Sequence, residues 1–249
     1  MKKPLALVVL LVFCLALLPR HVAQAQDDDC TMIGGVYDAE RERCVFSVGL
    51  DIQIDLPLDV KADYPMMAES LDAIVNTNTT TFLQYFAESA LLYATPPWSL
   101  YMEYEVYQQT PATPTEFSPE IVSVVYSIYS YTGGANGTGF YQTLVYDVTN
   151  QLPLTLDDVF VEGYLPTLAA LVREKLLVQL ADMSDPTFID FGAGEDPNNF
   201  RSFALTNDEL IFFFDEYQVA PGAAGPQELH IPLAELTDLI QPMYIPIAQ

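Results

Sequence analysis

Residues 121–148 read IVSVVYSIYSYTGGANGTGFYQTLVYDV. From Ile121 to Tyr131, apolar or aromatic residues occur at both odd and even positions, which is typical of a central strand that is covered on both faces. A second apolar run follows from Phe140 to Val148, and the glycines between the two runs can supply the positive φ angles of a turn. We therefore predict an antiparallel hairpin at the centre of a sheet.

Further strands are predicted on both sides of this hairpin. Every even position from Leu50 to Val60 is apolar, and a similar alternation runs from Leu100 to Tyr107, as expected of half-buried strands. Because Pro57 cannot donate to a ladder, the first strand is expected at a sheet edge or with a bulge. Downstream, strands are predicted at FRSFAL, LIFFFD and ELHIP, with a turn at TNDE.

Helical patterns separate these strands. Apolar residues at near-helical spacing predict a helix from Pro65 to Phe86, and a four-residue spacing predicts an amphipathic helix from Pro166 to about Asp182. A short helix is expected at residues 233–240, and residues 183–199 are expected to form a long loop. Strands and helices do not alternate regularly, so the fold class expected is α+β, with antiparallel sheets covered by helices on one face.

The N-terminal region has the pattern of an export signal. Two lysines precede an apolar run that ends before Pro19, and Ala23-Gln24-Ala25 is a small-x-small cleavage pattern. We expect a signal peptide at residues 1–25 and a secreted or extracytoplasmic protein with no stable membrane span after cleavage. The alternative is a retained anchor, although the run is short for spanning a bilayer.

Cysteine usage is consistent with export. The part of the chain after residue 25 contains Cys30 and Cys44, and two cysteines in an oxidising compartment predict a disulfide. We expect it to close a small hairpin with its turn at Gly34-Gly35. The predicted organisation is a disulfide hairpin and linker at 26–46, a β-α-β-rich region at 47–149, and a second α+β region at 150–249.

The charge of the chain restricts its partners. It contains 34 acidic and nine basic residues, and three of the basic ones lie within the expected signal peptide. Such a negative field repels nucleic acid and speeds the approach of a cationic protein. We therefore expect no nucleic-acid partner, although the acidity could serve solubility alone.

Known catalytic and metal-binding motifs are missing from the sequence. The sequence has no Gly-x-Ser-x-Gly elbow, His-Glu-x-x-His motif, phosphate-binding loop or dinucleotide fingerprint. His230 lies in an alternating strand and is expected to face solvent or a neighbouring loop. The acidic segment SDPTFIDFGAGEDPNN lacks the alternating oxygen ligands of an EF-hand. No catalytic residue, metal site or cofactor is therefore predicted, although a pair of carboxylates would carry no motif.

Tyrosines and shaped loops provide the candidate binding residues. Residues 210–232, LIFFFDEYQVAPGAAGPQELHIP, place a loop of small residues and prolines between two apolar runs. Exposed tyrosine is a common contact for proteins and sugars, and six tyrosines lie near this loop or near the glycine-rich turn: Tyr126, Tyr129, Tyr131, Tyr141, Tyr146 and Tyr217. We expect the loop at 217–227 to lie beside the turn at 131–139. The alternative is that both are merely tight connections of a sheet.

Two long stretches carry a family resemblance. SIYSYTGGANGTGFYQTLVYDVTNQLPLTLDDVF and FALTNDELIFFFDEYQVAPGAAGPQELHIPLAEL resemble the extracytoplasmic domain of the RsiV-type anti-sigma factors. This is a family of unknown general function, often preceded by a smaller partner domain that also occurs in a peptidoglycan deacetylase. The resemblance covers roughly residues 47–240. In this family a helix-covered antiparallel α+β domain binds a protein, and one member senses lysozyme.

The resemblance implies a non-catalytic binding module for a cationic protein such as lysozyme, or for a cell-wall glycan. Signalling to a sigma factor is not expected because only MKKP precedes the apolar run, and no deacetylase domain follows. Relatives commonly have histidine at the position of Asn136. The alternative is a carboxylate-dependent cell-wall glycan hydrolase or a deacetylase-associated domain. The binding residues predicted are Tyr131, Gly133, Gly134, Asn136, Tyr141, Tyr217, Gln218, Pro221, Pro226 and Gln227.

Overall fold

The structure is a computed structural model that describes residues 36–38, 43–45, 49–89, 98–111 and 113–245. The expected signal peptide and Cys30 lie outside these residues, so the signal and the disulfide remain predictions. The chain divides into two compact units, Met1–Leu50 and Asp51–Gln249. Within the described residues, no helix is both long and apolar enough to cross a membrane.

The first unit contains one described feature, a two-stranded antiparallel sheet. Strand β1 (Val36–Asp38) pairs with β2 (Arg43–Val45), and Tyr37 lies opposite Cys44. The connection between the two strands therefore follows Asp38. Gly34 and Gly35, where the turn was predicted, lie outside the described residues.

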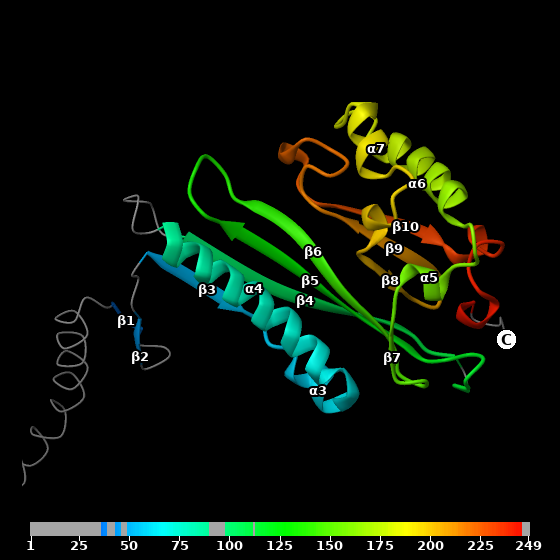
Figure 1. The fold of residues 1–249 in the computed structure, drawn as a ribbon, viewed down its shortest axis with the longest axis horizontal. Helices are drawn as coiled ribbons and strands as arrows, with labels where there is room; N and C mark the ends of the chain where they lie inside the picture. The colour runs from blue at the N-terminus through cyan, green and yellow to red at the C-terminus, as the bar shows by residue number, and fades with distance from the viewer. Residues whose placement is uncertain (1–35, 39–42, 46–48, 90–97, 112, 246–249) are drawn as a thin grey trace, which may run out of the picture. The chain divides into compact units, whose positions relative to one another are not determined.

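The second unit contains two antiparallel sheets and the helices that pack on them (Figure 1). In its first part the elements are β3 (Leu50–Ile54), α3 (Leu58–Asp63), a 3-10 turn (Pro65–Met67), α4 (Ala68–Ser89), β4 (Trp98–Gln109), β5 (Ile121–Tyr131), β6 (Thr138–Asp147) and β7 (Leu152–Leu154). Then follow α5 (Leu156–Val159), α6 (Leu165–Gln179), α7 (Pro186–Gly192), a 3-10 turn (Pro197–Phe200), β8 (Phe203–Leu205), β9 (Glu209–Phe214), a 3-10 turn (Gly222–Ala224), β10 (Gln227–Pro232) and two further 3-10 turns (Leu233–Glu235 and Pro242–Tyr244).

The predicted hairpin forms the centre of the larger sheet, whose strand order is β3-β4-β5-β6-β7. Val124 of β5 lies opposite Val106 of β4 and Leu144 of β6, and Tyr129 lies opposite Tyr101 and Gly139. Since side chains alternate between the faces of a strand, this register fixes which residues share a face. The prediction of a central, two-sided strand is confirmed by the nearly complete burial of β5 from Ile121 to Tyr126.

Helix α4 covers one face of this sheet (Figure 1). Its Leu71 and Phe82 are buried, and the amide of Asn78 donates to Gln142 of β6 at 2.6 Å. The helix continues through the threonines near its middle. There, the hydroxyl of Thr79 donates to the carbonyl of Val75 at 2.8 Å, which satisfies the side chain within the helix.

The smaller sheet has the order β10-β9-β8, and helices α6 and α7 lie against it (Figure 1). Phe212 and Phe214 of β9 are fully buried and share one core with Leu168, Val172 and Leu176 of α6. The opposite face of β9 packs on the larger sheet, because Ile211 and Phe213 share a second cluster with Val125 of β5. These contacts explain why every residue of β9 after Glu209 is buried.

The α+β class with antiparallel sheets is confirmed, whereas several predicted boundaries are wrong. The strand predicted to reach Val60 ends at Ile54, because Pro57 interrupts the ladder and α3 begins directly after it. The segment 183–199 contains α7 and a 3-10 turn rather than only a loop. Residues 233–240 contain a 3-10 turn where a helix was predicted. Strand β7 pairs with β6, so the larger sheet extends across the predicted boundary between the regions 47–149 and 150–249.

Candidate functional site

The glycine-rich turn between β5 and β6 lies next to the loop that follows β9. The N–H of Gly139 donates to the carboxylate of Glu216 at 2.7 Å, and the N–H of Glu216 donates to the carbonyl of Gly139 at 2.9 Å. Two residues further along β6, the N–H of Tyr141 donates to the carboxylate of Asp215 at 2.8 Å. These bonds join segments about 75 residues apart in the sequence. The expected proximity of the two loops is present in the structure.

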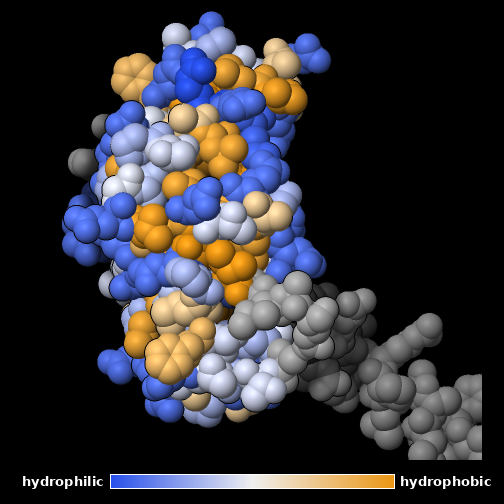
Figure 2. Space-filling model, turned by 90° about the vertical axis from the view of Figure 1, so that its right-hand side faces the viewer, coloured by the Kyte–Doolittle hydropathy of each residue, from blue (hydrophilic) through white to orange (hydrophobic). Residues whose placement is uncertain are grey.

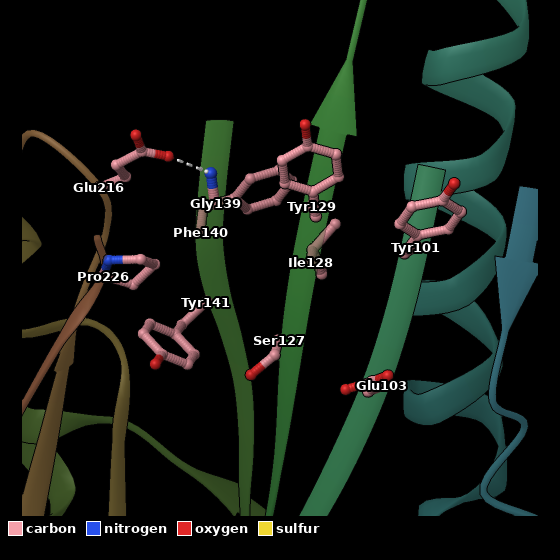
Figure 3. A pocket seen from close by; sticks show the side chains of 10 residues that line it. All are labelled: Tyr101, Glu103, Ser127, Ile128, Tyr129, Gly139, Phe140, Tyr141, Glu216 and Pro226. Atoms are coloured by element: carbon pink, nitrogen blue, oxygen red, sulfur yellow. Dashed lines mark hydrogen bonds between the residues drawn. The ribbon is translucent and has the colours of Figure 1, made fainter. Parts of the chain in front are cut away.

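An open groove lies where the two loops meet, over one end of the larger sheet (Figure 3). It consists of two hollows of about 320 and 740 Å³ that share Tyr101, Tyr129 and Glu216 in their linings. We call this the tyrosine groove. Its lining residues on the exposed face of β4, β5 and β6 and on the two loops include Ser99, Tyr101, Glu103, Ser127, Tyr129, Tyr131, Asn136, Tyr141, Glu216, Tyr217 and Pro226.

Two tyrosine rings on neighbouring strands line both hollows. The rings of Tyr101 and Tyr129 are stacked, with centroids 5.9 Å apart and planes inclined by 15°. The phenol of Tyr101 donates to the carboxylate of Asp51 at 2.6 Å. This bond raises the pKa of Tyr101, because it stabilises the protonated phenol beside a negative charge. Tyr101 is therefore a neutral ring held in place by β3.

Glycines leave the space into which the aromatic residues of the groove fit. A Cβ atom on Gly137 would lie 2.3 Å from the ring of Tyr129, and one on Gly222 would lie 2.2 Å from the ring of Tyr217. Tyr217 itself has a φ of 67°, an uncommon conformation for a non-glycine residue. The positions of the rings of Tyr129 and Tyr217 therefore depend on the absence of side chains opposite them.

Carboxylates are the ionisable groups other than tyrosine in the lining. Glu103 extends from β4 and Glu216 from the loop after β9 (Figure 3). Among the described residues that line the groove, none is basic. Burial, followed by the nearby Glu228 carboxylate, raises the pKa of Tyr141, so this side chain is also neutral. The groove thus offers aromatic rings, hydroxyls and negative charge, which suit a cation or a polar ligand with apolar faces.

The predicted binding residues fall into three groups. Five of them line the tyrosine groove: Tyr131, Asn136, Tyr141, Tyr217 and Pro226. Gly133 and Gly134 shape the turn, with φ angles of 98° and 107°, and the carbonyl of Gly134 accepts a bond from the phenol of Tyr131 at 3.0 Å.

The other three predicted residues support the loop after β9. The amide of Gln218 donates to the carbonyls of Gly192 and Asn199, at 2.8 and 2.9 Å. Gln227 donates to carbonyls of its own loop, including that of Ala224 at 2.7 Å. Pro221 precedes the 3-10 turn at Gly222. These side chains are therefore placed to fix the loop rather than to line the groove.

Some groove residues had no distinct signal in the sequence. Tyr101 and Glu103 occur in an alternating strand, and their place in the groove depends on the register that sets Tyr101 opposite Tyr129. Two of the six tyrosines named from the sequence lie elsewhere, because Tyr126 and Tyr146 are buried on the other face of the sheet, the face on which Gln142 bonds to α4. The parity of each position in its strand would have separated these two from Tyr129.

His230 lies outside the tyrosine groove. His230 is exposed on β10, with its Nδ1 2.9 Å from the carboxylate of Glu209, in agreement with the expected solvent-facing position. Within the part of the chain that the structure describes, no group of three or more His, Cys, Asp or Glu side chains is arranged to hold a metal ion.

Hydrophobic residues reach the surface outside the groove as well. Figure 2 shows the side of the molecule at the right of Figure 1, where apolar residues form a band bordered by hydrophilic ones. The turn and loop of the groove lie toward the left of Figure 1, so this band is separate from them. Apolar surface alone thus does not distinguish the groove, and its distinguishing feature is the meeting of two shaped loops over stacked tyrosines.

Part of the chain matches a known protein family. Residues 157–234 match a family described as "Protein of unknown function (DUF3298)". The matched segment extends from α5 through the smaller sheet to the turn after β10, and it includes the loop that forms one side of the groove.

Curated relatives carry different names. The chain is 32% identical over 131 residues to the peptidoglycan-N-acetylmuramic acid deacetylase PdaC of Bacillus subtilis, an alignment that covers 52% of this chain and 28% of PdaC. It is 29% identical over 150 residues to the anti-sigma-V factor RsiV of the same organism, covering 57% of this chain and 48% of RsiV. It is 26% identical over 218 residues to the esterase Rv3036c of Mycobacterium tuberculosis, covering 84% and 88%.

The resemblance to the RsiV-type family is confirmed by these matches. This chain spans about a quarter of the length of PdaC and about half that of RsiV. The relatives include a deacetylase, an esterase and an anti-sigma factor by name, so relatedness alone does not decide between binding and catalysis.

Proposed function

We propose that this chain is an extracytoplasmic binding module without catalytic activity. The partner is held in the tyrosine groove. The observation that carries this proposal is the meeting of the glycine-rich turn and the loop after β9 over the stacked rings of Tyr101 and Tyr129. Exposed aromatic rings on rigid strands bury much area at little cost in conformational entropy.

The partner that suits this groove best is a cationic protein, with lysozyme as the first example to test. Glu103 and Glu216 supply negative charge next to aromatic rings, and the whole chain has an excess of acidic residues. Both features favour association with a positive surface. A cell-wall glycan is the second partner considered, since stacked tyrosines also bind sugar rings.

A titration separates these partners. Wild-type protein, expressed from residue 26 onward, would be titrated calorimetrically with lysozyme and with peptidoglycan fragments at low and moderate salt. For a protein partner we expect binding to lysozyme that weakens with salt and that falls at least tenfold in Tyr129→Ala. The matched control is Tyr85→Ala, which removes a tyrosine exposed by 54% that does not line the groove.

Two results would count against the proposal. If neither lysozyme nor peptidoglycan fragments bind, the best-supported partners are removed. If they bind but Tyr129→Ala and Tyr85→Ala behave alike, the groove is not the binding site.

A carboxylate-dependent hydrolase is the second candidate function, because Glu103 and Glu216 line the same hollow. It predicts turnover of a peptidoglycan fragment or a simple ester, with loss of at least a hundredfold in Glu103→Gln or Glu216→Gln. Turnover that is absent in wild type, or unchanged in both variants, leaves binding as the function.

A further inference from the structure

Helix α7 presents exposed phenylalanine beside the tyrosine groove. The side chain of Phe191 is exposed by 87%, and with Phe188 it lines a separate hollow of about 320 Å³. The remaining lining residues are Thr187, Tyr217 and Gln218. We call this the phenylalanine hollow. Tyr217 lines both it and the tyrosine groove, so the two sites are contiguous.

The side-chain polar groups of Thr187 and Gln218, which line the phenylalanine hollow, already have partners within the protein. The hydroxyl of Thr187 donates to Asp185 at 2.6 Å. The amide of Gln218 donates to two carbonyls, and its oxygen accepts a bond from the N–H of Asp215 at 3.0 Å. A ligand in this hollow therefore meets mainly apolar surface, which favours an apolar side chain over a sugar with its many hydroxyls.

The hollow and the groove are rigidly connected. A Cβ atom on Gly192, the last residue of α7, would lie 1.8 Å from the carbonyl oxygen of Gln218. The helix and the loop are thus in direct backbone contact, and the Gln218 side chain bonds to both sides of it. Both sites are held in one arrangement before a ligand arrives, which lowers the entropic cost of binding.

We propose that the phenylalanine hollow and the tyrosine groove form a two-part site for one basic polypeptide. An apolar side chain of the ligand packs between Phe188, Phe191 and Tyr217, and a neighbouring lysine or arginine enters the groove beside Glu216. This inference rests on the proposed function and narrows its partner to a protein, since a glycan has no side chain for the hollow. Charge complementarity with the acidic chain supports a basic ligand.

The probe is an amidated peptide of alternating arginine and phenylalanine. A second peptide has serine in place of phenylalanine, and a third has citrulline in place of arginine. We expect Phe191→Ser to lower the affinity for the first peptide about tenfold or more, because burial of a phenylalanine side chain is lost. The serine peptide should bind more weakly than the first peptide and with equal affinity to wild type and variant. The citrulline peptide should bind more weakly than the first.

Val178→Ser is the matched control. Val178 is exposed by 78% on α6 and lines neither hollow, so its replacement should leave all three affinities unchanged. Thermal unfolding of both variants should match wild type, since both side chains are mostly in water. Phe191→Leu should retain most of the affinity, because it keeps an apolar side chain.

The inference is overturned if the first peptide fails to bind, if Phe191→Ser binds it as wild type does, or if Val178→Ser loses as much affinity. These outcomes are distinct from a failure of the proposed function. Lysozyme that binds through Tyr129 with no effect of Phe191→Ser refutes the two-part site and leaves the binding module in place. If the first peptide binds but neither lysozyme nor a glycan does, the two-part site stands and the two partners named in the proposed function are refuted.

Discussion

At the scale of single residues, Gly192 has the strictest steric requirement. A Cβ atom there would overlap the carbonyl oxygen of Gln218 at 1.8 Å, and backbone on both sides leaves little room to yield. We expect Gly192→Ala to lower the free energy of unfolding by about 2–4 kcal/mol, measured by urea denaturation.

Gly134→Ala provides the contrast. No atom lies within 4 Å of a Cβ at this position, but its φ is 107°, so only backbone strain of about 1–2 kcal/mol is expected. Equal effects of the two substitutions would show that the close approach of α7 to the loop is not what stabilises this region.

A second residue-scale prediction concerns Tyr104 and Asp59. The phenol of Tyr104 donates to the Asp59 carboxylate at 2.6 Å. This bond raises the pKa of Tyr104 to about 12 and lowers the pKa of Asp59. For Tyr104, the contribution to stability is complete below its ordinary pKa of about 10 and is lost as pH rises through about 12. For Asp59, the contribution is present above its ordinary pKa and is lost as pH falls through the lowered value.

Asp59→Asn should therefore return the Tyr104 titration toward pH 10, because the negative acceptor is removed. Ultraviolet titration of the variant, compared with wild type and with a control at an exposed acid, Asp182→Asn, would detect the change. An unchanged titration in Asp59→Asn would mean that the bond does not persist in solution.

At the scale of elements, β9 is predicted to be the least tolerant strand. Phe212 is fully buried against α6 and Phe200, so Phe212→Ala should cost about 3–5 kcal/mol through lost burial and the cavity left behind. Phe191→Ala makes the same chemical change at a side chain exposed by 87% and should cost less than about 0.5 kcal/mol. Chemical denaturation of the pair would contradict this account if the costs were similar.

The elements differ in how well their sequences predict them. The hairpin of β5 and β6 was predictable because two apolar runs enclose a glycine-rich turn, and α6 because its apolar stripe is continuous. Strand β7 was missed because three residues carry no period. Helix α7 was missed although Asp185 accepts a bond from the N–H of Thr187 at its start and Pro186 follows at the first helical position. These capping residues are a local signal that acidic composition obscured.

The candidate site shows the same limit. The proximity of the two loops was inferred from the glycines, prolines and tyrosines that they contain. The contributions of Tyr101 and Glu103 depend on strand register, and that of Phe191 depends on a helix that was not predicted. Such contacts join segments far apart in the chain, and no periodicity within one segment encodes them.

At the scale of the whole molecule, the charge predicts the kinetics of association. With 34 acidic against nine basic residues, the association rate with a cationic protein should fall severalfold between low and physiological salt, whereas the dissociation rate should change less. Surface-based kinetic measurements would test this. Glu103→Gln in the groove should affect dissociation more than Asp182→Asn, which changes an exposed acid outside it. An association rate that does not depend on salt would show that electrostatic steering does not contribute to binding.

The hydrogen bonds between the two sheets have a further consequence. The outward N–H groups of Phe203 and Leu205 in β8 donate to the hydroxyls of Thr143 and Ser123 on the larger sheet, at 3.3 and 3.2 Å. An edge strand with free donors is a template on which other chains can add and grow into fibres. Here two small hydroxyl side chains accept hydrogen bonds from those donors, so this edge is closed to aggregation, while the groove, which begins two residues along β6 at Tyr141, stays open.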